Sequence, residues 1–517
     1  MLALDAGSTS AKAQFFDAGG RALGPPVRTR VVIDPDGTAD ALAFLASVEA
    51  AVDEALRLRP GPVDAVAVSA AWHGLVGLGA DGRPTTPLTT WSATGPAVVA
   101  AATELRRRLG DGDPEAVRRR TGAPVHPSLP AARLLAEGVR DPAAFNATVR
   151  WCSIGELLET RWLAGAPGPS SSMASASGLF DQERRSWDAE VLLALGLRPG
   201  TLAAVDDEPR RGLAPAYRNR WPALAAALWW PALGDGACAL IGTGCGDLPG
   251  APASGRAGGG TGDPLRAASS TPADTAAGGG RRAALTVGTS AAVRVLAGAA
   301  ERAARPPALF AYLLDADRVV LGAARSNAGN LVPWLADVLR LDDDLRLDDD
   351  LVARVADRPP GCHGLRAVSD LAGERSPDWP LAASGSLTGL RPGTTALDIA
   401  QAFLEMAVCG LATAVDTLEA AVLAAGDRPP GDVTAGRLVL VGSGRALASS
   451  AAWRQLVADA TGRPLIPSRV EEASARGAAV VALEGVGWLD AHPDDDLDGD
   501  PVLPDPGRAE AFARLGV

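Results

Sequence analysis

The residues best suited to chemistry near the start of the chain are Asp5 and Lys12. Lys12 is the single lysine among 517 residues, and every other permanently charged cation is arginine. Lysine carries a compact point charge, whereas arginine presents a planar fork. Gly7, Ser8 and Thr9 lie between the two residues, and apolar segments flank them on both sides. The pattern predicts a hairpin whose turn offers backbone N–H and hydroxyl donors, which can cradle phosphate.

Length and composition indicate a large globular protein, whose secondary-structure elements must position this turn. A length of 517 residues exceeds what one core usually serves, so at least two domains are expected. The net charge of −12 argues against nucleic acid or an anionic membrane as the main partner. Residues 1–4 already read as a strand, and no stretch approaches the roughly 18 uninterrupted apolar residues of a membrane span. We therefore expect a cytoplasmic protein with a small-molecule partner.

Cysteine and histidine spacing indicates neither a disulfide framework nor a zinc site. The five cysteines form no CxxC pair, and the four histidines are equally dispersed. The cysteines are expected to be reduced, and any metal should have oxygen ligands. The acidic runs 342–350 and 494–500 read as solvated faces. The second run begins like a calcium loop, but the prolines that follow it oppose the required helix.

Extended and helical segments alternate along both halves of the chain, which predicts an α/β fold. In the first half, strands are expected at 1–4, 13–17, 28–33 and 63–69, with a helix at 39–57. In the second half, strands are expected at 237–241, 283–287, 291–296, 318–323 and 438–441, with helices such as 396–425 and 449–461. The proline-punctuated stretch 221–231 reads as the approach to a domain boundary. The segment 247–280 is nearly all Gly, Ala, Pro, Ser and Thr, so a mobile surface loop is expected.

Six further segments, taken in order with the Asp5 turn, resemble the FGGY carbohydrate kinases and particularly their gluconokinase-like members. They lie at 72–75, 121–127, 173–181, 234–237, 285–290 and 371–377. The resemblance covers nearly the whole chain. It implies two actin-like, ribonuclease-H-like α/β ATPase domains with ATP, Mg²⁺ and a sugar in the cleft between them. The implied limits are 1–232 for a sugar-binding and phosphate-loop domain and 233–517 for a nucleotide-binding domain with the insertion 247–280.

Under this resemblance the first hairpin would engage the phosphates of ATP. Gly7, Ser8 and Thr9 would supply backbone donors, since glycine permits close approach. Lys12 would reach phosphate oxygens as a point charge, and Asp5 would hold Mg²⁺, usually through water. A plain hairpin without chemistry remains the alternative.

Asp235 lies between two glycines, which leaves its carboxylate unshielded. By resemblance it is the general base toward the sugar hydroxyl, a role worth roughly 10² to 10⁴ in rate, and it also contacts the substrate and Mg²⁺. Trp72 and His73 follow the strand 63–69 and would give the sugar an apolar wall and a hydrogen-bond partner. A turn aspartate and a satisfied core histidine are the alternatives.

Glycine turns in the second half would complete the nucleotide site. Gly288 and Thr289 follow the strand 283–287 and offer a second donor loop to the phosphates. Gly442 and Gly444 follow the strand 438–441 and precede a helix, a setting that suits adenosine and the α-phosphate. An ordinary Gly-Thr turn is the alternative for the first of these loops.

Several positions depart from the family pattern. Arg445 replaces the second glycine of the nucleotide turn, where it could crowd the adenine or contact a phosphate. Ala93 and Gly95 stand where the family carries the charged residues of Trp-x-Asp-x-Arg, and Met406 replaces a glycine. These departures bear on which sugar binds and on how active the enzyme is.

The sequence therefore predicts an ATP-dependent sugar kinase, with gluconate as the leading acceptor. Xylulose or another ketose or polyol is the alternative within the class. A catalytically weak sugar- or nucleotide-binding regulator and an actin-like ATPase that assembles with protein partners are the alternatives outside it. A homodimer is left open.

Overall fold

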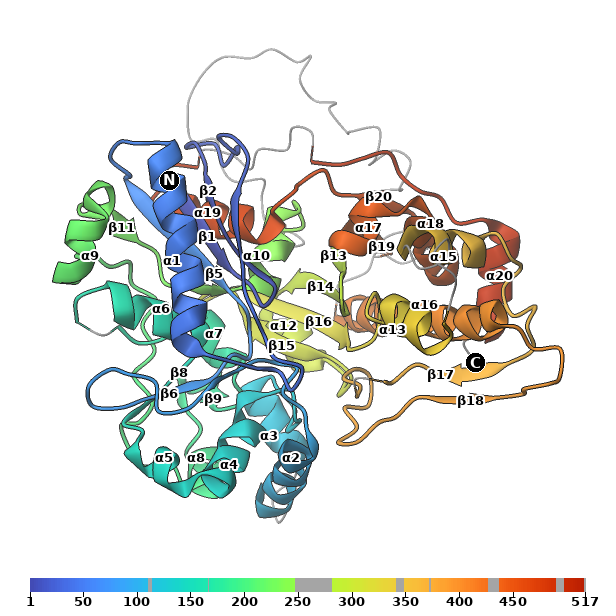
Figure 1. Ribbon diagram of the computed structural model, residues 1–517, viewed down its shortest axis with the longest axis horizontal. Coiled ribbons are helices and arrows are strands. Elements are labelled where there is room, and N and C mark those ends of the chain that lie inside the picture. Colours follow the sequence, from blue (N-terminus) through green and yellow to red (C-terminus); the bar gives the residue numbers. More distant parts are fainter. Residues whose placement is uncertain are drawn as a thin grey trace. The chain divides into compact units, whose positions relative to one another are not determined.

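The computed structural model describes residues 1–109, 114–165, 167–246, 281–340, 348–371, 373–425, 437–489 and 497–515. The predicted loop 247–280 and parts of both acidic runs lie outside these residues. The described residues form two compact units (Figure 1). The first unit takes in the described residues of Met1–Gly242, Phe310–Val320 and Glu472–Pro493, and the second those of Thr243–Leu309, Leu321–Glu471 and Asp494–Val517.

A mixed sheet forms the centre of the first unit. Its strands are β1 (Leu2–Ala6), β2 (Ser10–Phe15), β3 (Val27–Arg30), β5 (Ala65–Ala70), β11 (Leu228–Trp229) and β12 (Leu233–Gly234). The order is β3-β2-β1-β5-β11, and β12 also pairs with β5. β1 is antiparallel to β2 and parallel to β5, so the predicted hairpin is confirmed.

Two helices cover this sheet because each turns an apolar face toward it. α1 (Ala41–Leu58) packs on β2 and β3 and lies along the sheet in Figure 1. Its first turn is capped by Asp40, whose side chain accepts from the backbone N–H groups of Leu42 and Ala43. α19 (Ala473–Gly485) packs on β1 and β5, where Ala475 meets Ala3 in a buried cluster.

The predicted strand at 237–241 is wrong, because these residues lie in helix α10 (Asp235–Gly242). A short apolar run does not distinguish a buried strand from a buried helix. The helix is stabilised by close packing on α19. A Cβ atom on Gly242 would lie 1.8 Å from the Ala473 carbonyl oxygen, and one on Gly477 would lie 1.8 Å from that of Cys238. Glycine at these two positions therefore lets the helices approach.

The first unit has a second apolar core, which includes Leu105, Leu134, Trp151 and Leu179, and several further short elements. The helices are α2 (Pro96–Leu109), α3 (Pro114–Thr121), α4 (Pro130–Arg140), α5 (Pro142–Ala147), α6 (Ile154–Trp162), α7 (Ser171–Ser175), α8 (Ala189–Leu195), α9 (Pro215–Arg220) and the 3-10 turn Pro222–Leu224. The short strands are β4 (Thr38–Ala39), β6 (Val76–Leu78), β7 (Leu88–Thr89), β8 (Arg150–Cys152), β9 (Phe180–Asp181), β10 (Ser186–Trp187) and β15 (Phe310–Leu313).

The second unit repeats the strand layout of the first. Its strands β16 (Val319–Arg325), β14 (Ala291–Ala297), β13 (Arg281–Val287), β19 (Leu438–Ser443) and β20 (Leu465–Pro467) are hydrogen-bonded in that order. β13 is antiparallel to β14 and parallel to β19, as β1 is to β2 and β5. The other elements are α12 (Ala299–Ala304), α13 (Leu331–Val338), α15 (Asp348–Ala356), α16 (Ala396–Ala425), α17 (Arg445–Ser449), α18 (Ala451–Thr461), α20 (Pro506–Leu515), β17 (Arg366–Val368) and β18 (Ser386–Thr388). The two α/β domains that the resemblance implies therefore share the same pairing of their central strands.

One helix among the described residues, α16, is long and apolar enough to cross a membrane by length and composition alone. Half of its most apolar stretch is buried, and within the second unit the helix packs on α12, α18 and β14. A core helix of a globular domain has the same properties.

The compact units do not divide at the expected limits 1–232 and 233–517, which stay a prediction about domains. Residues 233–242 group with the first unit, because β12 pairs with β5 and α10 packs on α19. Asp235 therefore lies in the same unit as Asp5, Lys12 and His73, and not in the unit that contains Gly288.

Candidate active site

The register of three strands gathers charged and polar side chains around Asp5. Asp5 lies opposite Lys12 on β2 and opposite Ser69 on β5. Its Oδ2 accepts a hydrogen bond from Lys12 Nζ at 2.9 Å, and its Oδ1 accepts one from Ser69 Oγ at 2.9 Å. The carboxylate is buried, with 4% of the residue exposed. Gly7, Ser8 and Thr9 form the turn that follows β1, as predicted.

Lys12 also pairs with a second carboxylate, Glu472, at 3.1 Å. Burial by itself lowers the pKa of Lys12, but the two carboxylates outweigh it, and the net effect raises that pKa above its ordinary value. Glu472 pairs in addition with Arg28 at 2.6 Å. Lys12 therefore remains a cation at any working pH and can offer its charge to a phosphate oxygen.

Ser69, Arg28 and Glu472 are functional candidates that sequence reasoning missed. Glu472 lies far along the chain and reaches Lys12 only because α19 packs on the first sheet. The sequence signal that could have found it is an acidic pair, Glu471 and Glu472, directly before the run of small residues that forms α19.

Asp235 begins α10 directly after β12, beside the end of β5. Its Oδ1 accepts from the backbone N–H of Trp72 at 3.2 Å and from that of Gly236 at 2.8 Å. Burial raises the pKa of the Cys238 thiol, and the negative charges of Asp5 and Asp235 raise it further. Asp5 near the end of β1 and Asp235 directly after β12 both lie at the carboxyl ends of parallel strands, where open α/β sheets place ligands.

Trp72 and His73 follow β5 on the same side of the first unit. Trp72 Nε1 donates to the Ser172 carbonyl oxygen at 3.1 Å, and its ring meets Tyr312 edge-on with centroids 5.1 Å apart. A Cβ atom on residue 234 would lie 1.7 Å from Trp72 Nε1, so only glycine fits there. This close approach brings the Trp72 backbone and Asp235 together.

His73 has a backbone φ of 66°, a value that residues other than glycine rarely adopt. Its Nδ1 lies 2.7 Å from the Ala176 carbonyl oxygen, so Nδ1 carries the proton. The His73 carbonyl accepts from Arg133, which also donates to the Thr90 carbonyl. Burial lowers the pKa of Arg133 to about 9. Arg133, another residue that the sequence did not reveal, thus holds the His73 backbone in place.

The second unit brings its two predicted glycine turns together. A Cβ atom on Gly444, whose φ is 91°, would lie 2.5 Å from the Val287 carbonyl oxygen, next to Gly288 and Thr289. Gly442 lies within β19 itself, where a Cβ atom would approach Leu447 and Leu465 at 3.0 Å. Its place in the strand indicates a packing role, whereas Gly444 forms the turn.

The carboxylates of the first unit fit a hard divalent cation. Among the described residues, no group of three or more His, Cys, Asp or Glu side chains is arranged to hold a metal ion. Mg²⁺ needs fewer protein ligands, because it usually takes one or two carboxylates together with water and phosphate oxygens. Asp5 already accepts from Lys12 and Ser69, so its contact with Mg²⁺ would pass through water.

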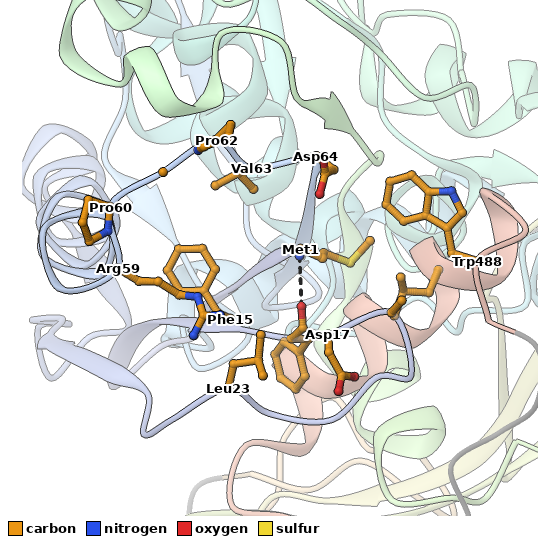
Figure 2. A pocket seen from close by; sticks show the side chains of 14 residues that line it. Met1, Phe15, Asp17, Leu23, Arg59, Pro60, Pro62, Val63, Asp64 and Trp488 are labelled. Carbon is orange, nitrogen blue, oxygen red and sulfur yellow. Dashed lines mark hydrogen bonds between the residues drawn. The ribbon is translucent and has the colours of Figure 1, made fainter.

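A separate pocket of about 280 Å³ lies at the other end of β1 and β2 (Figure 2). Its walls include the apolar side chains of Phe15, Leu23 and Trp488, with Arg59 at one side, and more of the lining surface is polar than apolar. None of the predicted site residues lines it.

Both units carry a glycine turn at the same place in the same strand order, which is the layout of actin-like ATPase domains. Residues 1–208 match the N-terminal domain of the FGGY family of carbohydrate kinases, and residues 283–485 match its C-terminal domain. The chain therefore belongs to the FGGY family of carbohydrate kinases, phosphotransferases that act on a sugar hydroxyl group.

Similar proteins agree with this assignment. Gluconokinase from Bacillus subtilis (strain 168) is 23% identical over 506 residues, covering 95% of this chain and 88% of that protein. Xylulose kinase from Streptomyces rubiginosus is 27% identical over 421 residues, covering 81% and 73%. The crystal structure of gluconate kinase from Lactobacillus acidophilus superposes with a TM-score of 0.79 at 21% identity, covering 100% and 95%. The predicted two-domain, actin-like α/β fold is confirmed.

Proposed function

We propose that this kinase transfers the γ-phosphate of ATP to a hydroxyl group of a sugar acid, with gluconate as the leading acceptor. The likeness to gluconokinases over nearly the whole chain supports this choice. The similarity to a xylulose kinase keeps xylulose, or another ketose or polyol, as the alternative within the class. We expect the enzyme to act in the cytoplasm.

The observation that carries the proposal is the fixed carboxylate of Asp235. Two backbone N–H groups hold its Oδ1, which fixes the carboxylate beside the end of β5, where an acceptor hydroxyl would approach. As the sugar oxygen attacks the γ-phosphorus, its proton passes to Asp235, and the bond between the γ-phosphorus and the bridging oxygen breaks to release ADP. Trp72 and His73 would orient the sugar from the end of β5.

Phosphoryl transfer depends mostly on positioning and charge neutralisation. Lys12 would bind a phosphate oxygen, and Gly7, Ser8 and Thr9 would add backbone and hydroxyl donors. Asp5 and Asp235 are the residues that would hold Mg²⁺. When bound, Mg²⁺ neutralises charge on the β- and γ-phosphates.

The nucleotide is proposed to bind the second unit through Gly288, Thr289 and Gly444, with Gly442 supporting the turn from within β19. This assigns the sugar and the catalytic carboxylates to the first unit and the nucleotide mainly to the second.

A second candidate is a sugar- or nucleotide-binding regulator with little turnover. Ala93 and Gly95 favour it, because they remove two charged positions of the family pattern, and Arg445 replaces a glycine of the nucleotide turn. Such a protein would be stabilised by its ligands without forming product.

The decisive experiment measures ADP release with ATP and Mg²⁺ across gluconate, xylulose, ribulose, glycerol and related polyols. A kinase gives a signal that requires both Mg²⁺ and one particular acceptor. A melting temperature raised by ATP, together with no ADP release for any acceptor, would favour the regulator.

A further inference from the structure

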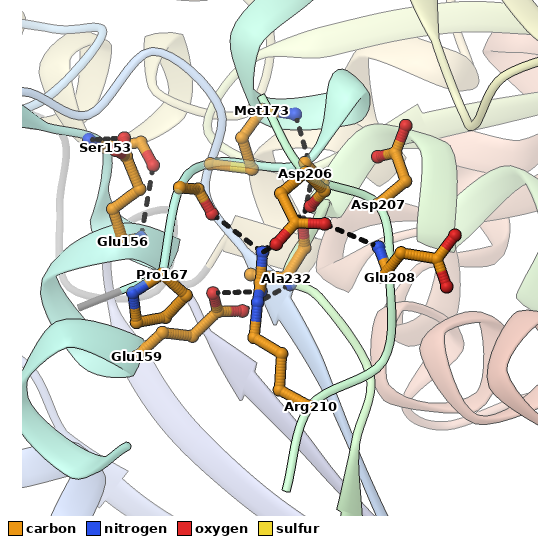
Figure 3. A network of polar contacts seen from close by, with 12 residues as sticks. Ser153, Glu156, Glu159, Pro167, Met173, Asp206, Asp207, Glu208, Arg210 and Ala232 are labelled. Atoms are coloured by element: carbon orange, nitrogen blue, oxygen red, sulfur yellow. Dashed lines mark hydrogen bonds and ion pairs between the residues drawn. The ribbon is translucent and has the colours of Figure 1, made fainter. Parts of the chain in front are cut away.

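A buried polar network holds Ala232 and Gly234, two of the three residues that precede Asp235, and Figure 3 shows its contacts at Ala232. The backbone N–H of Ala232 donates to Glu159 Oε1 at 2.6 Å, and the Ala232 carbonyl accepts from Ser170 Oγ. The backbone N–H of Gly234 donates to Ser172 Oγ at 3.1 Å. β12 is only two residues long, so side chains supply bonds that a longer strand would obtain from its neighbours.

Glu159 is fixed by a guanidinium that also binds two loops. It lies on α6 with 3% of its side chain exposed, and its Oε2 pairs with Arg210 at 2.8 Å. Arg210 donates in addition to the carbonyl oxygens of Gly168 at 3.0 Å and Asp206 at 2.8 Å. The pair therefore joins α6, the loop before α7 and the loop at 206–210 to the strand that leads into Asp235.

The bonds of this network require Glu159 to be ionised. Oε1 faces the Ala232 N–H and Oε2 faces Arg210, so a proton on either oxygen would oppose a donor. Burial raises the pKa of Glu159 to about 7, and the nearby charges of Glu156 and Asp206 act in the same direction, against Arg210 and the Ala232 N–H. Removing the charge of Glu156 or Asp206 would lower this pKa and favour the ionised form, whereas removing Arg210 would raise it.

We propose that Glu159, fixed by Arg210, is a positioning residue that sets the place of Asp235 through the Ala232 backbone. The inference rests on the proposed role of Asp235 as the base. A displacement of about 1 Å at a reacting group can cost on the order of 100-fold in rate, so a tether three residues away can control turnover.

Glu156 provides a matched comparison on the same helix. It is also buried, but its Oε2 accepts from the backbone N–H of Ser153 at 2.8 Å and closes the capping box of α6. Replacing Glu156 should therefore lower stability without moving β12. Replacing Glu159 should change catalysis as well.

The test compares full-length Glu159→Gln and Glu156→Gln with the acceptor that the wild type uses. We expect kcat to fall about tenfold or more in Glu159→Gln, with both KM values changed less than about threefold. Glu156→Gln should keep kcat within about twofold, even if its melting temperature falls. Rates are normalised to the folded fraction measured by circular dichroism.

Ser170→Ala and Asp235→Asn complete the set. Ser170→Ala removes the other side-chain bond to Ala232 and should lower kcat about threefold, which tests the tether even if Glu159→Gln does not fold. Equal kcat per folded molecule in Glu159→Gln and Glu156→Gln, or in Ser170→Ala and wild type, would overturn the inference. If Asp235→Asn turns over normally, the proposed base fails first; if it is inactive while Glu159→Gln is fully active, only the positioning role fails.

Discussion

The hairpins β1–β2 and β13–β14 have the same place in their units but different chemistry. Asp5 on β1 lies opposite Lys12 and next to Ser69 on β5. Thr286 holds the matching place on β13, opposite Ala292 and next to Ser443 on β19. Asp5 accepts from Ser69 at 2.9 Å, whereas the hydroxyl groups of Thr286 and Ser443 lie 3.2 Å apart.

This difference assigns separate tasks to two copies of one layout. The first hairpin holds a buried carboxylate and the only lysine, so it can act on charge that develops during phosphoryl transfer. The second hairpin has uncharged residues, Thr286 and Ala292, at the same positions. Its turn contains Gly288, which would let a phosphate approach the backbone closely. The fold contains the turn twice, and we propose that the charged side chains of the first copy make it the catalytic one.

The largest expected effect comes from removing the carboxylate of the first hairpin. Asp5→Asn should lower kcat by about 10² or more, because the charge that would hold Mg²⁺ and orient Lys12 is lost. Thr286→Val, the matching change in the second hairpin, should change kcat less than about threefold. Steady-state ADP release at saturating ATP measures both. Similar losses in the two variants would remove the proposed division of tasks.

The next effect separates two cations that share Glu472. Lys12→Met should raise the KM for ATP about tenfold or more, because Lys12 also pairs with Asp5 and is the proposed phosphate ligand. Arg28→Met removes the other partner of Glu472. Because the Arg28 side chain is nearly half exposed, this change should alter the KM for ATP less than about threefold. Initial rates at varied ATP provide the test, and an equal response would show that Lys12 serves only to neutralise Glu472.

Two glycines of the second unit should respond differently to alanine. Gly444→Ala places a Cβ atom 2.5 Å from the Val287 carbonyl at a φ of 91°, so it should lower the melting temperature by several degrees, about 2–4 °C per kcal/mol of strain. A Cβ atom on Gly288 meets nothing within 4 Å, so Gly288→Ala should melt like the wild type. Scanning calorimetry distinguishes them, and an unchanged melting temperature in Gly444→Ala would contradict the described turn.

The smallest effect is expected at Arg445, which is exposed at the start of α17. Arg445→Gly restores the glycine pair of the family pattern and should change the KM for ATP less than about threefold, because an exposed side chain contributes little. A much larger change in ATP binding by calorimetry would give this arginine a direct role in holding a phosphate.

The sequence predicted those parts of the fold that local patterns determine. Alternating apolar segments located β1, β5 and α1, and the Gly-Ser-Thr turn located Asp5 and Lys12. The run at 237–241 predicts a strand, but its apolar content is equally compatible with a helix. Only its packing on α19, made possible by Gly242 and Gly477, decides for a helix.

The site was predictable where its residues are close in the sequence and not where packing brings them together. Glu472 reaches Lys12 from a distant helix, and Glu159 reaches Ala232 across 73 positions. Neither pair of residues is joined by a motif or a regular spacing in the sequence, so a single sequence could not predict the contact. The partners of Asp5 and Asp235 therefore had to come from the structure.

The most direct test of the account compares Asp235→Asn with the wild type in two assays on the same preparation. Calorimetry gives the Kd for ATP with Mg²⁺, and ADP release gives kcat with the preferred acceptor. We predict a Kd within about twofold of the wild type and a kcat lowered by about 10² or more. A variant that turns over at nearly the wild-type rate would contradict the assignment of Asp235 as the base.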